Sequence, residues 1–247
     1  MEALTGFTAL QVAAALAATF GSAFVRGLTG FGMAIVLVPV LALAMLPLEA
    51  VLVTNFLGLF IGLSEIRRLV RDAEKSAWVI CALVVVATPV GLYLLTVTGP
   101  DLARLIIALV ALSAFAIILF PSQGEVTHGP ITTGGVGVIS GLLTGFAGMP
   151  GPPVVPYYVG RALPRAVATA SMLLIFTVAA AAGLGAGAVL GELDWRLLGL
   201  ALALFPAVLV GNWAGAKTSG RVSDPVWRIC VGTVLAGVAL GALYRLL

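Results

Sequence analysis

Two glycine-rich turns interrupt apolar stretches of the chain and carry the residue types best suited to hold an anion. The first covers residues 26–32 and the second residues 142–153, with four prolines crowded between 150 and 156. A proline run of this density cannot continue as a regular helix. A helix that starts after such a turn presents free N–H groups and the positive end of its dipole. The two turns therefore predict a binding site for a small anion.

Arg26 stands directly before the first turn and adds a fixed positive charge. Its guanidinium could donate charge-assisted hydrogen bonds to an oxyanion. Equally, an arginine at the cytoplasmic end of a helix can do no more than set the orientation of the chain in the membrane. The glycines, for their part, could simply let helices cross closely. Their duplication and the density of prolines favour a binding site over close crossing, whereas the two explanations of Arg26 stay open.

The elements that must position these residues are membrane helices. Of the 247 residues, 61% are hydrophobic and 9% are charged, with a mean hydropathy of +1.18, whereas soluble domains are about half apolar and a quarter charged. The net charge of +3 and the pI near 9.2 come from short Lys/Arg clusters between apolar runs. Such clusters set orientation in a membrane and do not form a nucleic-acid-binding face. A polytopic membrane protein follows.

Apolar runs separated by Gly, Pro and charged residues predict ten segments within a single membrane domain, 1–247. They cover residues 7–25, 31–46, 48–66, 77–98, 103–120, 131–148, 152–160, 165–190, 197–214 and 226–245. A span needs about 20 residues, so the second segment is marginal and the seventh is too short. We expect these two to be half-helices buried against their neighbours. The predicted fold is an all-α polytopic transmembrane bundle of about 8–10 helices, with broken or short helices at its centre.

The two halves of the chain repeat each other. Leu28-Thr-Gly-Phe31 recurs as Leu143-Thr-Gly-Phe146, a shift of 115, and after a two-residue insertion a shift of 117 relates further positions. The pairs at this second shift are Pro39 and Pro156, Pro47 and Pro164, Thr54 and Ser171, Trp78 and Trp195, and Pro89 and Pro206. The repeats cover residues 7–120 and 131–246, with five segments in each.

An odd number of segments in each half predicts that the second half is inverted relative to the first. The connection at 67–75 is basic, whereas its counterpart at 191–196 is net acidic, so equivalent loops should face opposite sides. With both termini outside, ten of the 13 Lys and Arg lie on the cytoplasmic side and three outside. We therefore expect a multi-pass protein of the inner (plasma) membrane in this orientation.

Polar residues within apolar segments extend the candidate site beyond the turns. Thr54, Asn55 and Ser171 could bind substrate oxygens or simply hydrogen-bond neighbouring helices. Because both halves keep the hydroxyl, we favour substrate contact. The predicted substrate-binding residues are Arg26, Thr29, Gly30, Phe31, Gly32, Thr54, Asn55, Thr144, Gly145, Phe146, Gly148, Met149, Gly151 and Ser171.

The chain lacks the residue patterns of an intramembrane enzyme. Such enzymes place a Ser/His pair, an Asp pair or an HExxH motif in their spans. Here no Asp is central in a segment, and the single histidine, His128, falls between the halves. Glu49 and Glu65 lie at segment boundaries, and we interpret both as solvated charges. We expect no catalytic residue, no metal and no cofactor, and no proton relay of the Asp/Glu/His type.

The duplicated turns resemble those of the TauE/SafE family of sulfite and organosulfonate exporters. The resemblance rests on Gly27-Leu-Thr-Gly30-Phe-Gly32 with Pro39, and on Gly145-Phe-Ala-Gly148 with Pro156. It extends over nearly the whole chain. The resemblance implies eight or more helices and export of small sulfur-containing anions such as sulfite, sulfoacetate or taurine-derived products. The run Met149-Pro-Gly-Pro-Pro153 departs from the glycine-rich pattern of the family.

The leading interpretation is an exporter of small sulfur-containing oxyanions that works by alternating access at a central site formed by the broken segments. An inside-negative potential of 100 mV favours outward movement of an anion by about 2.3 kcal/mol per charge. Export therefore needs no coupling carboxylate. An anion channel, an uptake permease for another small anion and a scaffold subunit are the alternatives, followed by an intramembrane enzyme. The expected partners are the substrate anion and membrane lipids, with no nucleic acid, and a homodimer is compatible with the sequence.

Overall fold

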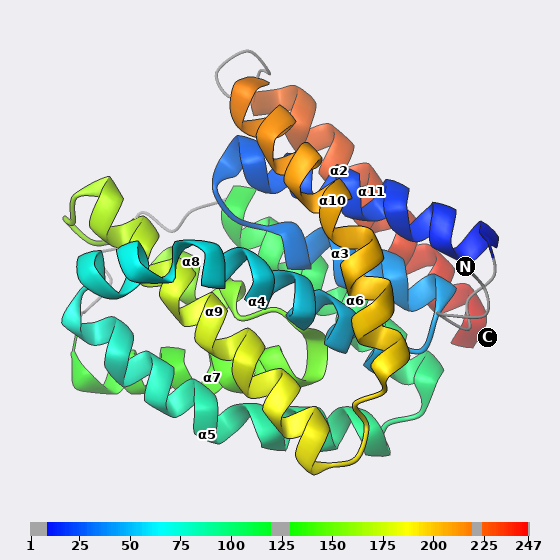
Figure 1. Ribbon diagram of the computed structural model, residues 1–247, viewed down its shortest axis with the longest axis horizontal. Coiled ribbons are helices and arrows are strands. Elements are labelled where there is room, and N and C mark those ends of the chain that lie inside the picture. Colours follow the sequence, from blue (N-terminus) through cyan, green and yellow to red (C-terminus); the bar gives the residue numbers. More distant parts are fainter. Residues whose placement is uncertain (1–8, 120–128, 219–223, 247) are drawn as a thin grey trace.

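The computed structural model describes residues 9–119, 129–218 and 224–246, which form ten helices and no strand (Figure 1). The helices are α2 (Ala9–Thr29), α3 (Met33–Ala44), α4 (Pro47–Asp72), α5 (Lys75–Val97), α6 (Pro100–Leu119), α7 (Pro130–Ala147), α8 (Gly151–Val159), α9 (Arg165–Val189), α10 (Trp195–Thr218) and α11 (Asp224–Leu246). Seven of them are long and apolar enough to cross a membrane: α2, α4, α5, α6, α7, α9 and α10. The predicted all-α polytopic membrane bundle is confirmed. His128 lies outside the described residues.

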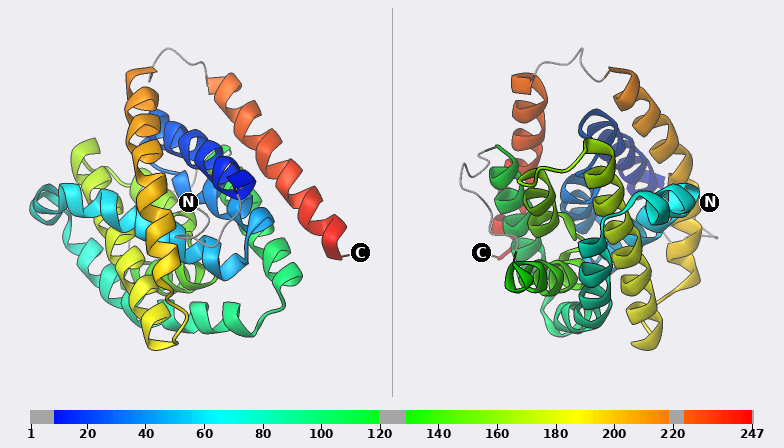
Figure 2. Two further views of the ribbon diagram at one scale, coloured as in Figure 1. Left: turned by 45° about the vertical axis from the view of Figure 1, so that its right-hand side comes forward. Right: turned by 90° about the vertical axis from the view of Figure 1, so that its left-hand side faces the viewer.

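Apolar side chains cover the outer surface of the bundle as well as its interior. Val86, Leu240 and Val97 are 74%, 68% and 61% exposed. A soluble protein rarely exposes a continuous apolar surface, but in a membrane such residues face lipid tails. Figure 2 shows α11 along one edge of the molecule, where it packs against α6.

The chain breaks within both predicted turns, at residues 30–32 and 148–150, and glycines make each break. The prediction that the proline-dense stretch cannot form a helix was wrong, because α8 runs through it, with Pro152 and Pro153 in its first turn, where a helix tolerates proline. After α2, Gly30 and Gly32 have φ angles of 88° and 93°, which residues with a Cβ rarely adopt. After α7, Gly148 has a φ of 65°, and the N–H groups of Gly148 and Met149 bond back to the last turn of the helix. This is the usual glycine termination of a helix.

The two helices that follow the breaks are too short to cross a bilayer. α3 has 12 residues and α8 has nine, so they are about 18 Å and 14 Å long at 1.5 Å per residue. The hydrocarbon core is about 30 Å thick. Both segments are therefore half-helices, as the sequence predicts. Irregular backbone between helices at this depth must be buried in protein or line a cavity.

α4 extends further than the sequence pattern indicates, to Asp72 instead of residue 66. Glu65 forms an ion pair with Arg68 one turn later, and Arg71 pairs with Asp72 at 2.7 Å. Charge pairs of this kind let a helix continue beyond its apolar part into water. The basic residues assigned to a loop thus lie mostly on the last turns of α4.

Glycines let two pairs of helices approach closely. A Cβ on Gly27 of α2 would lie 2.7 Å from the backbone nitrogen of Ala216 on α10. A Cβ on Gly145 of α7 would clash with the backbone of Thr88 and Leu92 on α5. In a membrane the hydrophobic effect does not drive helices together, so their association depends on close packing, which small residues at the crossing allow. At these two glycines the close-crossing explanation therefore applies.

The helix contacts follow the internal repeat. α2 packs on α10 and α7 packs on α5, two pairs that the repeat makes equivalent, while α4 packs on α9 and α6 on α11, each with its own counterpart. α4 and α9 run antiparallel, because Asn55 faces Gly183 and Gly62 faces Thr177. An inverted repeat requires this direction. The inversion itself stays a prediction.

Candidate functional site

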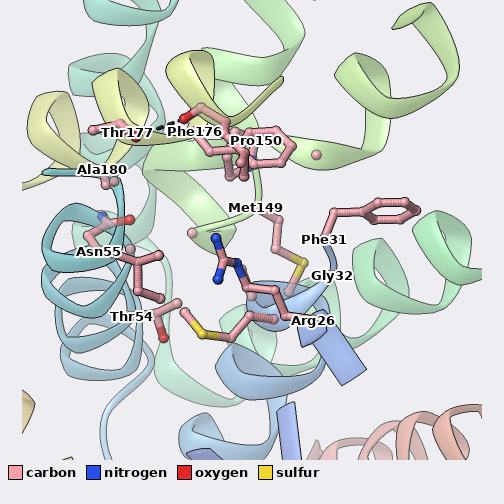
Figure 3. A pocket seen from close by; sticks show the side chains of 18 of the residues that line it. Arg26, Phe31, Gly32, Thr54, Asn55, Met149, Pro150, Phe176, Thr177 and Ala180 are labelled. Atoms are coloured by element: carbon pink, nitrogen blue, oxygen red, sulfur yellow. Dashed lines mark hydrogen bonds between the residues drawn. The ribbon is translucent and has the colours of Figure 1, made fainter. Parts of the chain in front are cut away.

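A cavity of about 90 Å³ lies where the two broken segments meet α4 and α9 (Figure 3). On this scale one water molecule needs about 10–15 Å³, so the cavity has room for several waters or one small anion. Its walls are mostly apolar, with polar groups from α2, α4 and α9. The lining residues include Arg26, Phe31, Gly32, Met33, Thr54, Asn55, Gly62, Glu65, Leu69, Gly148, Met149, Pro150, Gly151, Leu173, Phe176 and Thr177.

The N-terminal ends of both half-helices contribute to this lining. Gly32, Met33 and Ala34 do so for α3, and Pro150 and Gly151 for α8. No side chain caps either end. The first N–H groups of a helix have no acceptor within the helix and form its positive pole. The two half-helices therefore place positive dipole ends on the same cavity.

Arg26 brings a cation to the cavity from the last turn of α2. Its guanidinium extends inward between Asn55 and Met149 (Figure 3). Nη1 donates a hydrogen bond of 3.0 Å to the amide oxygen of Asn212 on α10. In the part of the chain that the structure describes, no carboxylate forms an ion pair with Arg26. A neutral amide thus holds the guanidinium in place without cancelling its charge.

Thr54 and Asn55 add two polar groups with unmet hydrogen bonds. Each residue is 3% exposed, and both line the cavity. Thr54 Oγ1 and Asn55 Nδ2 have no hydrogen-bond partner among the described residues. A buried polar group without a partner costs about 1–3 kcal/mol and calls for an explanation such as an absent ligand. An oxyanion in the cavity would supply an acceptor to either group once its side chain turned toward the cavity.

The structure brings together eight of the fourteen predicted residues. Arg26, Phe31, Gly32, Thr54, Asn55, Gly148, Met149 and Gly151 all line the cavity. The other six lie elsewhere: Thr29, Gly30, Thr144, Gly145, Phe146 and Ser171 are absent from the lining. For Thr29 and Thr144 the hydroxyl donates to a carbonyl of its own helix, at Val25 and Ser140.

Ser171 lies in a polar cluster at the end of α8, away from the cavity. Its hydroxyl accepts a hydrogen bond from the Glu74 N–H. Arg161, just after α8, binds the Glu74 carboxylate through both terminal nitrogens, at 2.8 Å and 3.0 Å. The Arg161 guanidinium also lies 5.2 Å from the ring centre of Tyr157. The cluster therefore fastens the C-terminal end of α8 to the connection between α4 and α5.

Several lining residues were not in the predicted set. Thr177 and Phe176 come from α9, and Glu65 comes from α4. No local signal marks the first two, because they reach the cavity through the crossing of α4 and α9. Glu65 was interpreted as a boundary charge. It does pair with Arg68 and remains 38% exposed, but it also forms part of the cavity wall.

Long apolar helices, two half-helices and a mostly apolar cavity with a few polar groups at their meeting point define a polytopic membrane protein built like a transporter. The family model of the sulfite exporter TauE/SafE matches residues 14–242. The chain therefore belongs to the sulfite exporter TauE/SafE family, and the resemblance noted from the turns is confirmed. It is a multi-pass membrane protein of a transporter family. No curated protein and no solved structure matches the chain.

Proposed function

We propose that this protein exports small sulfur-containing oxyanions, such as sulfite or organosulfonates, across the inner membrane by alternating access at the central cavity. The observation that carries the proposal is the convergence of hydrogen-bond donors and positive helix ends on one cavity. Arg26, the unpartnered Thr54 and Asn55, and the N-terminal ends of α3 and α8 all line it. Each of these groups favours negative charge or accepting oxygens.

The amide of Asn55 can donate a hydrogen bond into the cavity after a simple rotation. Its Nδ2 lies against Gly183 and finds no acceptor there. Turning the amide about its Cβ–Cγ bond exchanges nitrogen and oxygen in nearly the same space. The NH₂ group would then face the cavity and donate to an anion.

The position of the cavity supports loading from the cytoplasm. Glu65 and Leu69, near the end of α4, belong to its lining. The basic residues that predict the cytoplasmic side follow directly, at Arg67, Arg68 and Arg71. Positive charge at an entrance raises the local concentration of anions. A membrane potential of 100 mV, negative inside, then favours their outward movement by about 2.3 kcal/mol per charge.

Flux measurements on the purified protein in liposomes test the proposal. We expect saturable, potential-dependent movement of sulfite or of a sulfonate such as sulfoacetate, with chloride as the comparison anion. Flux that never saturates would favour an anion channel. Absence of flux for every small anion would overturn the proposal.

A further inference from the structure

Arg104, in the first turns of α6, lies outside the cavity lining but binds the far end of the half-helix α3. We infer that Arg104 is a positioning residue for the transported anion. Through α3 it fixes both the place and the positive potential of the helix end that lines the cavity. This inference rests on the proposed function and adds a residue that does not itself touch the substrate.

The Arg104 guanidinium binds carbonyl groups at the C-terminal end of α3. Nε donates to the carbonyl oxygen of Ala42 at 2.7 Å, and Nη2 donates to that of Met45 at 3.4 Å. The last carbonyls of a helix have no N–H partner within the helix and form its negative pole. The Arg104 side chain is only 11% exposed. A largely buried cation therefore lies on the negative pole of α3.

The position of α3 depends strongly on contacts with other helices. With 12 residues, it has a length at which an isolated helix is marginal. Pro39, inside the helix, removes the usual hydrogen bond to the carbonyl of Ile35. At the cavity end, Gly30 and Gly32 have positive φ angles and no side chain caps the helix. The hydrogen bonds from Arg104 hold the other end.

The two ends of α3 are coupled because the helix between them is short. It is about 18 Å long, and Gly32, Met33 and Ala34 at its N-terminal end line the cavity. A tilt at the C-terminal end would turn these N–H groups, and a hydrogen bond weakens steeply as its angle falls. Loss of the cation would also leave the negative pole uncompensated and lower the positive potential at the cavity. Both effects weaken the binding of an anion.

Asp101, one turn earlier on α6, opposes the charge of Arg104. Its Oδ1 accepts a hydrogen bond of 2.7 Å from Arg104 Nη1. The carboxylate side chain is 51% exposed, whereas the guanidinium side chain is 11% exposed. Water therefore screens the carboxylate more than the guanidinium, and a net positive charge acts on α3. Removing Asp101 and removing Arg104 should have opposite effects on anion affinity.

Transport of sulfite by the full-length protein in liposomes tests this role, with affinity and maximal rate measured separately. We expect Arg104→Gln to weaken the affinity about fivefold, with a nearly unchanged maximal rate per folded molecule. Arg104→Lys should restore most of the affinity, because lysine keeps the charge. Asp101→Asn should not weaken it. Arg196→Gln is the matched control, because Arg196 also pairs with an aspartate at the start of a helix but binds Asp194 instead of a helix end.

Hydrogen exchange of the detergent-solubilised protein gives a second measurement that does not require transport. We expect Arg104→Gln to speed the exchange of the amides of α3. The amides of α8 should exchange as in the unaltered protein, because a different residue, Arg161, holds the C-terminal end of α8. α8 is thus an internal control for general loss of stability.

The outcomes separate this inference from the proposed function. Weaker affinity in Arg104→Gln, recovery in Arg104→Lys and faster exchange of α3 alone support it. Unchanged sulfite affinity in Arg104→Gln overturns it while leaving anion transport intact. Equal weakening in Asp101→Asn and Arg104→Gln also overturns it, because the ion pair would then be structural only. Absence of flux for every small anion in the unaltered protein overturns the proposed function, and the positioning of α3 then stands or falls with its exchange.

Discussion

The two broken segments are related by the internal repeat but contribute different chemistry to the cavity. At the first break, Arg26 supplies a charge, and α3 starts with Met33 and Ala34, whose N–H groups are free of intrahelical bonds. At the second break, α8 starts with Gly-Pro-Pro, and Pro152 and Pro153 have no N–H to offer. The first break therefore provides most of the hydrogen-bond donors, and the second provides a part of the cavity lining made rigid by its prolines.

The packing of the helices explains why the second half has no arginine at the position equivalent to Arg26. The repeat position of Arg26 is Gly141, at the shift of 115. A Cβ on Gly141 would lie 2.7 Å from the Cβ of Ala87 and 2.9 Å from the carbonyl oxygen of Val84. No side chain fits there. Where the first half carries a charge, the second half therefore has close helix packing.

The sharpest test of this difference is Arg26→Ala. It removes the cation while leaving the turn intact, and we expect anion affinity to fall about a hundredfold, which corresponds to roughly 3 kcal/mol. Substrate-dependent flux in liposomes measures it. Arg196→Ala is the control, because Arg196 is exposed and pairs with Asp194. Unaltered transport in Arg26→Ala would show that this arginine serves topology alone.

A larger side chain where α7 crosses α5, beside the second break, should lower the stability of the protein. A Cβ on Gly145 would clash with backbone atoms of Thr88 and Leu92, and overpacking costs about 1–3 kcal/mol. We expect Gly145→Ala to lower the thermal stability of the detergent-solubilised protein. Gly134→Ala, on the same helix, has open space around its Cβ and should leave stability nearly unchanged. Equal stability of both variants would contradict the observed crossing of α7 and α5.

The sequence could predict the breaks but not all of the surfaces that meet at them. Proline density and clustered glycines are local features, so the half-helices and Arg26, Thr54 and Asn55 were recognisable from residue type. Thr177 reaches the cavity because α9 crosses α4, and no local pattern records a crossing angle. The repeat also misled in one respect: it paired Ser171 with Thr54, but Ser171 on α9 accepts a hydrogen bond from the Glu74 N–H and does not line the cavity. Symmetry in sequence does not require symmetry in function.

The hydrogen bond from Arg26 to Asn212 offers a way to make the crossing of α2 and α10 resemble its counterpart, the crossing of α7 and α5. At the shift of 117, Asn212 corresponds to Leu95. Asn212→Leu should release the guanidinium and weaken anion affinity about tenfold, the typical effect of losing one hydrogen bond to a charged group. Asn212→Asp should instead hold Arg26 but cancel its charge, with a larger loss. If Asn212 had only a structural role, both variants would lose stability, but Asn212→Asp would not bind the anion more weakly than Asn212→Leu.

The far ends of the half-helices are anchored in different ways, and pH should distinguish them. Arg104 donates to the carbonyl of Ala42 at the end of α3, at 2.7 Å, whereas α8 is anchored by the ion pair of Arg161 with Glu74. Burial raises the pKa of Glu74, but hydrogen bonds from Ser76 and Arg161 and the charge of Arg161 outweigh it, so its pKa is lowered.

A carboxylate with a lowered pKa stabilises the fold above its unfolded pKa, and this stability is lost as the pH falls through the folded pKa. We expect acidification to loosen α8 before α3. Because the pair is partly exposed, Glu74→Gln should cost no more than about 1 kcal/mol and should flatten the acid side of the stability profile. Hydrogen exchange of α8 and α3 at neutral and acidic pH measures both effects. Equal acid sensitivity of the two half-helices would argue against the ion pair as the anchor of α8.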